Sequence, residues 1–91
     1  MIDGNLSVET VEPDATPAGN LVVHVEVSNT ASTKASGTLY VEVAEYLGQR
    51  VRSKTRQVEV GTHGSKTYDV EFAIEVPESS FDDYRFDGQI V

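Results

Sequence analysis

An alternation of apolar and polar residues at positions 21–28 constrains the fold most strongly. Leu21, Val23, Val25 and Val27 occupy every second position of this segment. Because successive side chains of a strand point to opposite faces, the pattern indicates a strand with one buried and one solvated face. Val, Ile and Thr supply 25 of the 91 residues, whereas Leu supplies four. Branching at Cβ favours an extended backbone over a helix, so we predict an all-β chain with no helix.

Further segments repeat this period of two and are separated by turn residues. They lie at residues 6–11, 39–46, 50–60, 68–76 and 84–90. Six to seven antiparallel strands connected by short turns are typical of a β-sandwich. We therefore predict that residues 1–91 form one β-sandwich domain, and we expect the isolated domain to be a monomer.

Two irregularities interrupt the alternation. It slips between Val8 and Val11, which predicts a β-bulge near Thr10. If the basic residues of the fourth strand point to solvent, the pattern slips again before Val58. This second slip predicts a bulge near Gln57, or a crossing of the strand from one sheet to the other.

The apolar positions also predict how the strands are grouped. We expect the second and fifth strands to pair in one sheet, and the third, fourth and last strands to pair in the other. This arrangement places Val25, Val41 and Phe72 in the shared core. The outward face of the first sheet then carries acidic residues together with His24: Glu26, Asp69, Glu71 and Glu75.

The charge of the chain limits its partners. Fifteen acidic residues against seven basic ones give a formal net charge of −8. Nucleic acid and anionic lipid both require cationic surface, so we expect neither as a partner. No apolar run approaches the length of a membrane span. Nine Glu against three Lys favour a salt-rich environment, in which self-repulsion is screened. We therefore expect a halophilic, archaeal source, with an ordinary acidic domain as the alternative.

Few residues offer catalytic or metal-binding chemistry. Cysteine is absent, which excludes disulfides and thiolate zinc ligands. Two isolated histidines, His24 and His63, do not supply the three ligands of a catalytic zinc site. No G-x-S-x-G nucleophile pattern occurs. We therefore predict no catalytic residues, no cofactor and no metal site, and we do not expect an enzyme.

Two smaller features stay open. A calcium site and a solvated acidic loop both fit the carboxylates at residues 78–87, which are Glu78, Asp82, Asp83 and Asp87. The tripeptide Asn5-Leu6-Ser7 is a glycosylation sequon, which would matter only in an exported protein.

One surface combines the residue types that dominate binding hot spots, Arg and Tyr. A three-residue turn at 47–49 would set Tyr46 opposite Arg50, and Ala44 opposite Arg52. All four arginines would then share one outward face with two tyrosines. The predicted partner-binding face comprises Tyr40, Tyr46, Arg50, Arg52, Lys54, Arg56 and Arg85. We expect it to bind an acidic protein, such as a neighbouring domain, or an anionic surface polymer. The alternative is that these side chains form ordinary ion pairs and protect a sheet edge.

From Val25 onward the order of motifs resembles a known group of modules. A strand ends in Asn (VEVSNTA), and an aromatic strand (GTLYVEVAEYLGQRV) follows a Ser/Thr loop. A Gly-Ser turn (VGTHGSKTYDVEF) and a Tyr-bearing last strand (YRFDGQIV) complete the pattern. This order is similar to that of the FxLYD and CARDB group of immunoglobulin-like domains.

The resemblance covers about residues 6–91 and carries several implications. It implies an immunoglobulin-like β-sandwich from a larger surface, secreted or lipoprotein-like protein. It also implies a non-enzymatic binding or structural role at the cell surface or outside the cell. The alternative is a small free-standing intracellular protein, a stress-related sandwich of the late-embryogenesis type, located in the cytoplasm.

Overall fold

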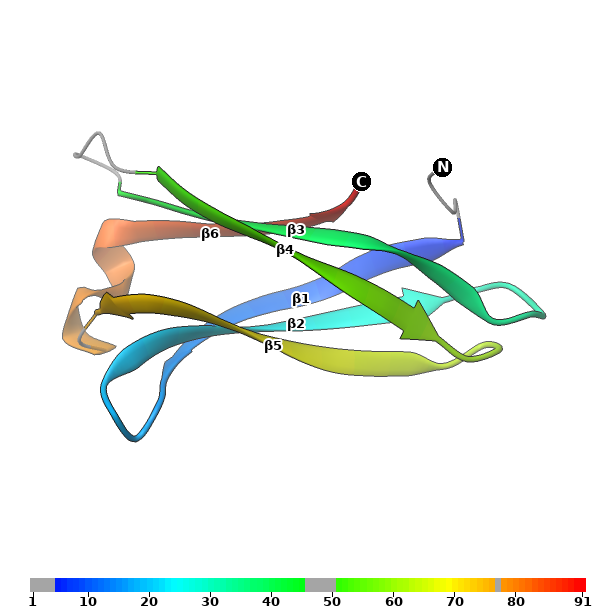
Figure 1. The fold of residues 1–91 in the computed structure, drawn as a ribbon, viewed down its shortest axis with the longest axis horizontal. Helices are drawn as coiled ribbons and strands as arrows, with labels where there is room; N and C mark the ends of the chain where they lie inside the picture. Colours follow the sequence, from blue (N-terminus) through cyan, green and yellow to red (C-terminus); the bar gives the residue numbers. More distant parts are fainter. Residues whose placement is uncertain (1–4, 46–50, 77) are drawn as a thin grey trace.

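Six strands and one short 3-10 helix make up the described part of the chain (Figure 1). The computed structural model describes residues 5–45, 51–76 and 78–91. The elements are β1 (Leu6–Ala15), β2 (Asn20–Asn29), β3 (Ala35–Glu45), β4 (Val51–Val60), β5 (Ser65–Glu75), the 3-10 helix η1 (Glu78–Asp83) and β6 (Tyr84–Ile90). These ranges contain no α-helix, as predicted, but the segment at 78–83 is wound into η1 where we predicted a loop. No helix in the same ranges has the length and apolar character needed to cross a bilayer.

The strands form two antiparallel sheets of three strands each. One sheet has the order β1-β2-β5 and the other the order β4-β3-β6. The chain passes from one sheet to the other after β2, after β4 and through η1. In Figure 1 the sheet with β3, β4 and β6 lies above the sheet with β2 and β5. The predicted sandwich and the predicted membership of both sheets are confirmed.

The core lies between the inner faces of the two sheets. Val25 and Val41 have no exposed surface, and Phe72 is 3% exposed, so the predicted core positions are confirmed. Strand β2 contributes four buried side chains at alternate positions to this core. It is the central strand of its sheet, and the β4-β3-β6 sheet covers one of its faces. The alternation of apolar and polar residues in the sequence is therefore a consequence of this burial.

The predicted bulge in β1 is present. The register of β1 with β2 shifts between Val8 and Thr10, so that Glu9 is the extra residue. The shift moves Val11 onto the inner side, where it packs against the core. An edge strand with a bulge bends and twists more strongly, which lets β1 follow the curvature of the sandwich.

The register between β3 and β4 differs by one residue from the prediction. Val43 is opposite Arg52, and Ala44 is opposite Val51. The predicted pairing of Ala44 with Arg52 is therefore wrong. The ladder also runs without a shift from residue 51 to residue 60, so the predicted bulge near Gln57 is absent. A slip of one residue moves every side chain of a strand to the opposite face, and the cations of β4 are consequently found on the other side.

Candidate binding site

The structure separates the residues of the predicted partner-binding face. Tyr40 and Arg85 do lie on the outward face of the β4-β3-β6 sheet, since Tyr40 is opposite Gln89 and Arg85 is opposite Ala44. Tyr46 and Arg50 lie outside the described residues. The shared face is therefore reduced to one tyrosine and one arginine among the residues described.

The three remaining cations lie on the inner face. Arg52, Lys54 and Arg56 are opposite Val43, Val41 and Leu39, which are all core residues. Directly opposed residues of an antiparallel pair share a face, so the prediction that these cations point outward is wrong. They nevertheless remain exposed, because β4 is an edge strand and their long side chains leave the sandwich on its open side.

Two of these cations bind the backbone of β5 in the other sheet. Lys54 Nζ donates a hydrogen bond of 2.6 Å to the carbonyl oxygen of Glu71. Arg56 donates one of 2.7 Å to the carbonyl oxygen of Asp69. Strand β5 is an edge strand, so these carbonyls face no neighbouring strand, and charged donors form the stronger class of hydrogen bond.

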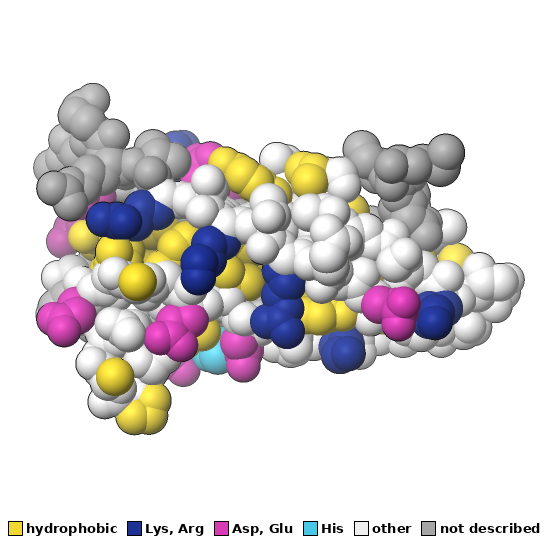
Figure 2. Space-filling view, in the orientation of Figure 1, with side chains coloured by type: hydrophobic (Ala, Val, Ile, Leu, Met, Phe, Trp, Pro, Cys, Tyr) yellow, Lys and Arg dark blue, Asp and Glu magenta, His cyan; other side chains and the backbone are white. Residues whose placement is uncertain are grey.

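Aromatic side chains of β5 complete the contact between the two edges. The guanidinium of Arg56 lies 5.1 Å from the centre of the Tyr68 ring, and Lys54 Nζ lies 5.9 Å from that of Phe72. The hydroxyl of Tyr68 hydrogen-bonds both backbone groups of Glu59 in β4. We call the set Lys54, Arg56 and Tyr68 the β4–β5 seam. Figure 2 shows Lys and Arg side chains running in a row along this side of the molecule, with hydrophobic side chains visible beside one end of the row.

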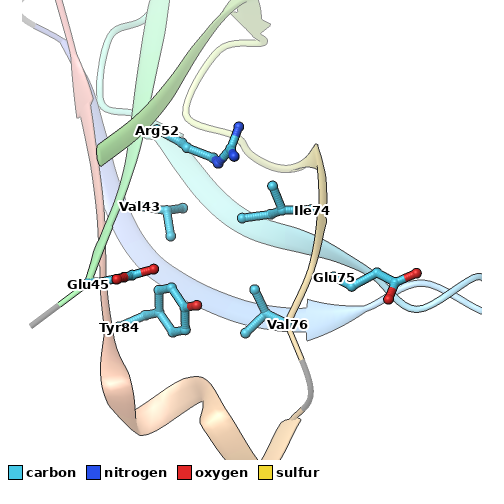
Figure 3. Close-up of a pocket in the computed structure, with 7 residues that line it drawn as sticks. All are labelled: Val43, Glu45, Arg52, Ile74, Glu75, Val76 and Tyr84. Atoms are coloured by element: carbon cyan, nitrogen blue, oxygen red, sulfur yellow. The ribbon is translucent and has the colours of Figure 1, made fainter. Parts of the chain in front are cut away.

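A cavity lies beyond the seam, where the row of cations continues to Arg52. Its volume is about 130 Å³, and its lining residues are Val43, Glu45, Arg52, Ile74, Glu75, Val76 and Tyr84. In Figure 3 the guanidinium of Arg52 reaches across from β4 towards Ile74, while the carboxylate of Glu75 points away. Val43, Ile74, Val76 and the ring of Tyr84 form the apolar wall, and Glu45 lies at the end opposite Arg52. We call this the Arg52 pocket.

Arg52 differs from its neighbours in the row. Its guanidinium makes no hydrogen bond or ion pair with any residue of the described ranges. Its guanidinium presents a planar fork of N–H donors that matches the geometry of a carboxylate. Chemically, the pocket offers a cation at one end of an apolar wall.

His24 forms a second polar cluster, on the outward face of the β1-β2-β5 sheet. Its Nδ1 lies 2.6 Å from Asp69 Oδ1 in β5, and its Nε2 lies 3.3 Å from Asp14 Oδ2 in β1. Contact with Asp69 raises the pKa of His24, and Asp14 adds to this, while partial burial acts in the opposite direction. The pKa of Asp14 is lowered by the hydrogen bond from the Ala15 amide and, to a smaller extent, by the contact with His24. The prediction that His24 and Asp69 share this outward face is confirmed, but their direct contact and the contact with Asp14 were not predicted.

The acidic and histidine-containing segments supply no metal centre in the described residues. No group of three or more His, Asp or Glu side chains in those ranges is arranged to hold a metal ion. In the segment considered for calcium, Asp87 Oδ1 accepts a hydrogen bond of 3.0 Å from the amide of Gly88. His63 lies in a turn with a φ of 50° and is separate from the His24 cluster.

Comparison with known proteins adds no relative. No protein-family model, no curated protein sequence and no solved structure matches this chain.

Proposed function

We propose that this β-sandwich is a non-enzymatic binding module that binds an acidic partner through the Arg52 pocket. The partner belongs to the class expected from the sequence, an acidic protein or an anionic surface polymer. The site differs from the predicted outward face, because it lies at the open side between β4 and β5.

One observation carries the proposal. Lys54 and Arg56 are engaged by backbone carbonyls of β5, whereas Arg52 projects over apolar side chains without a partner in the described residues. The planar fork of a guanidinium binds a carboxylate in paired hydrogen bonds, and the apolar side chains beside Arg52 offer a contact for the aliphatic part of a ligand.

The lining residues restrict the ligand further. The volume of about 130 Å³ suits one aliphatic side chain rather than a large ring system. Glu45 at the far end repels a second anionic group there. The ligand group that fits best is a single carboxylate attached to a branched aliphatic stem.

A titration followed by NMR tests this proposal. The probe is N-acetyl-leucine, and the matched neutral probe is N-acetyl-leucinamide. A ligand of this size binds with a Kd on the order of 1 mM, so concentrations above that value are required. We expect the carboxylate to shift the resonances of Ile74, Val76 and Tyr84 more strongly than the amide does.

Substitution of the cation provides the control. Arg52→Gln should abolish the difference between the two probes, whereas Lys34→Gln, a loss of charge at an exposed ion pair with Glu59, should preserve it. Equal binding of the two probes to the unmodified protein would refute a role for Arg52 in anion binding.

The place of the module in a larger surface or secreted protein is a further part of the proposal. It is supported by the order of motifs over about residues 6–91 and by the sandwich architecture, which is the fold that the resemblance implies. Cell fractionation followed by detection with an antibody against this domain tests it. Recovery of the antigen in the cytosolic fraction alone would favour the free-standing intracellular alternative.

A further inference from the structure

Three of the four sheet edges in the described chain are protected against pairing with another strand. Strand β1 carries the bulge at Glu9 and also Pro13, which lacks an amide donor. Strands β4 and β5 are joined through the β4–β5 seam. Among the described strands, β6 pairs only with β3; it packs against β1 of the other sheet, but no backbone hydrogen bond joins these two strands.

The backbone groups on the open edge of β6 can be identified. The amide of Val91 donates to the carbonyl of Thr38 at 2.9 Å, and the register places Tyr40 opposite Gln89. Hydrogen-bonded pairs alternate along an antiparallel ladder, so the odd-numbered residues of β6 bond to β3. The amides and carbonyls of Tyr84, Phe86, Gly88 and Ile90 therefore point to the open edge.

The side chains on the inner side of this edge are apolar and half-buried. Tyr84, Phe86 and Ile90 pack against the rim of the core without being enclosed by it. On the outward side of the same strand, a shallow hollow of about 260 Å³ is lined by Glu42, Ala44, Arg85, Phe86 and Asp87. The edge thus combines unpaired backbone groups with apolar surface, which is the combination that accepts an added strand.

The charges on the outward side of β6 form a complementary pair. Arg85 and Asp87 are two residues apart and share the face that carries Ala44 and Glu42. Neither forms an ion pair with a residue of the described ranges. Because the two charges are opposite and lie on the same strand, a second copy of the strand running antiparallel can neutralise both.

We propose that the open edge of β6 binds β6 of a second copy of the chain, in an antiparallel pair centred on Phe86. In this register Phe86 is opposite its counterpart and Tyr84 is opposite Gly88 of the other copy. Arg85 is opposite Asp87 of the other copy on both sides of the two-fold axis. The even-numbered residues form the hydrogen-bonded pairs, and the charged residues form the non-hydrogen-bonded pairs, where side chains are closest.

Neighbouring registers are disfavoured by the same charges. Moving one copy by two residues keeps the hydrogen bonds but sets Asp87 opposite itself, or Arg85 opposite itself. Like charges in directly opposed positions destabilise a strand pair. The partner that this edge fits best is therefore its own copy, although the sequence alone led us to expect a monomer.

Salt should promote this association. Each copy carries a formal charge of −8, so two copies repel each other at long range. The screening length falls from about 10 Å at 0.1 M to about 3 Å at 1 M, so added salt weakens this repulsion further, while opposed side chains in contact are screened less. We expect the dimer to be more populated in about 1 M KCl than in about 0.1 M KCl.

Sedimentation equilibrium with charge-reversal variants tests the proposal. The unmodified protein should associate reversibly to a dimer in about 1 M KCl. Arg85→Asp and Asp87→Arg should each weaken self-association at least about tenfold, because each sets like charges opposite one another at two positions. The double variant, with Arg85→Asp and Asp87→Arg together, should recover it.

A mixture of the two single variants gives the sharpest result. Each variant alone should be monomeric, whereas an equimolar mixture should form a heterodimer, since its opposed charges are again complementary. Lys34→Asp is the control, because it changes the charge by the same amount as Arg85→Asp at a site away from β6, and it should leave the dimer intact. A protein that stays monomeric, or a dimer that ignores the charge reversals on β6, would overturn the proposal.

Discussion

Tyr68 in β5 and Glu59 in β4 belong to different sheets, yet the side-chain hydroxyl of Tyr68 hydrogen-bonds both the backbone amide and the backbone carbonyl of Glu59. The amide of Glu59 donates to the hydroxyl oxygen at 2.8 Å, and the hydroxyl donates to the Glu59 carbonyl at 2.8 Å. These backbone groups lie on the open edge of β4, so the phenol occupies the place that a neighbouring strand would take.

Removing this hydroxyl should therefore destabilise the fold. Tyr68→Phe keeps the ring but leaves two partly buried backbone groups unpaired, and we expect the free energy of unfolding to fall by about 1–2 kcal/mol. Urea denaturation measures the change. Tyr40→Phe is the control, since its hydroxyl bonds the Glu42 side chain on the same strand, and its effect should be smaller. Equal losses in the two variants would contradict the bridging role of Tyr68.

Asn29 should be the most sensitive polar position. It is 2% exposed, and its side-chain amide donates to the carbonyls of Thr33, Val60 and Gly61 at 2.9–3.1 Å. Asn29→Ala should cost about 2–3 kcal/mol, because it leaves buried carbonyls unpaired. Asn29→Asp should cost more, since it places a carboxylate against those carbonyls.

Thermal and urea denaturation compare these variants with Asn20→Ala. The side chain of Asn20 bonds an exposed Glu71 at 3.2 Å, so its loss should be nearly neutral. If Asn29→Asp proved as stable as the unmodified protein, the carbonyl-binding role of Asn29 would be wrong.

The His24 cluster should make stability depend on pH. The pKa of the His24 side chain is raised in the folded state, chiefly by Asp69, above the ordinary value of 6.5. The stabilisation is then fully present below pH 6.5 and is lost as the pH rises through the raised pKa. The free energy of unfolding should fall over this window in the unmodified protein and remain flatter in His24→Gln.

NMR titration of the imidazole tests the cause of the shift. Asp69→Asn should bring the pKa of His24 down further than Asp14→Asn does, because Asp69 makes the shorter contact and the larger contribution. A larger effect of Asp14→Asn would show that the assignment of the cause is wrong.

Salt should raise the thermal midpoint of unfolding. The outward face of the β1-β2-β5 sheet gathers seven carboxylates, Glu9, Glu12, Asp14, Glu26, Asp69, Glu71 and Glu75. His24 lies among them. Their mutual repulsion is unscreened at low ionic strength and decreases as salt is added. Replacing Glu26 and Glu75 together by Gln should raise the midpoint in about 0.01 M salt and reduce its further increase in 1 M KCl. An identical salt response in the two proteins would contradict this explanation.

The strands and their grouping could be predicted because the burial of one face produces an alternation of apolar and polar residues within a short stretch of sequence. In β2 and β5 every second residue enters the core, so alternation over a few residues defines both the strand and its inner face. The bulge in β1 was predictable for the same reason, since Val8 and Val11 cannot both face inward in a regular strand. These features depend on residues close together in the sequence.

The inner-face cations could not be predicted from the assumption that charges face solvent. Val58 and Val60 are buried, and the unbroken ladder puts Arg56, Lys54 and Arg52 on the same side of β4. Val58 and Val60 occupy the same alternate positions as these cations. If the inner face of β4 is assigned from the two valines, the cations are placed on that face as well. Edge strands tolerate charges on the inner face because long side chains reach the opposite edge. The His24 cluster depends on the register of three strands, which no local pattern records.

The β4–β5 seam also bears on the order in which the chain folds. Its hydrogen bonds join residues only 9, 13 and 17 positions apart, whereas the sheet pairing of β2 with β5 joins distant parts of the chain. Short loops close at a smaller entropic cost, so contacts of this kind form early. We expect the seam to be present in the folding transition state, before β5 docks beside β2. Tyr68→Phe should accordingly slow refolding more than it accelerates unfolding.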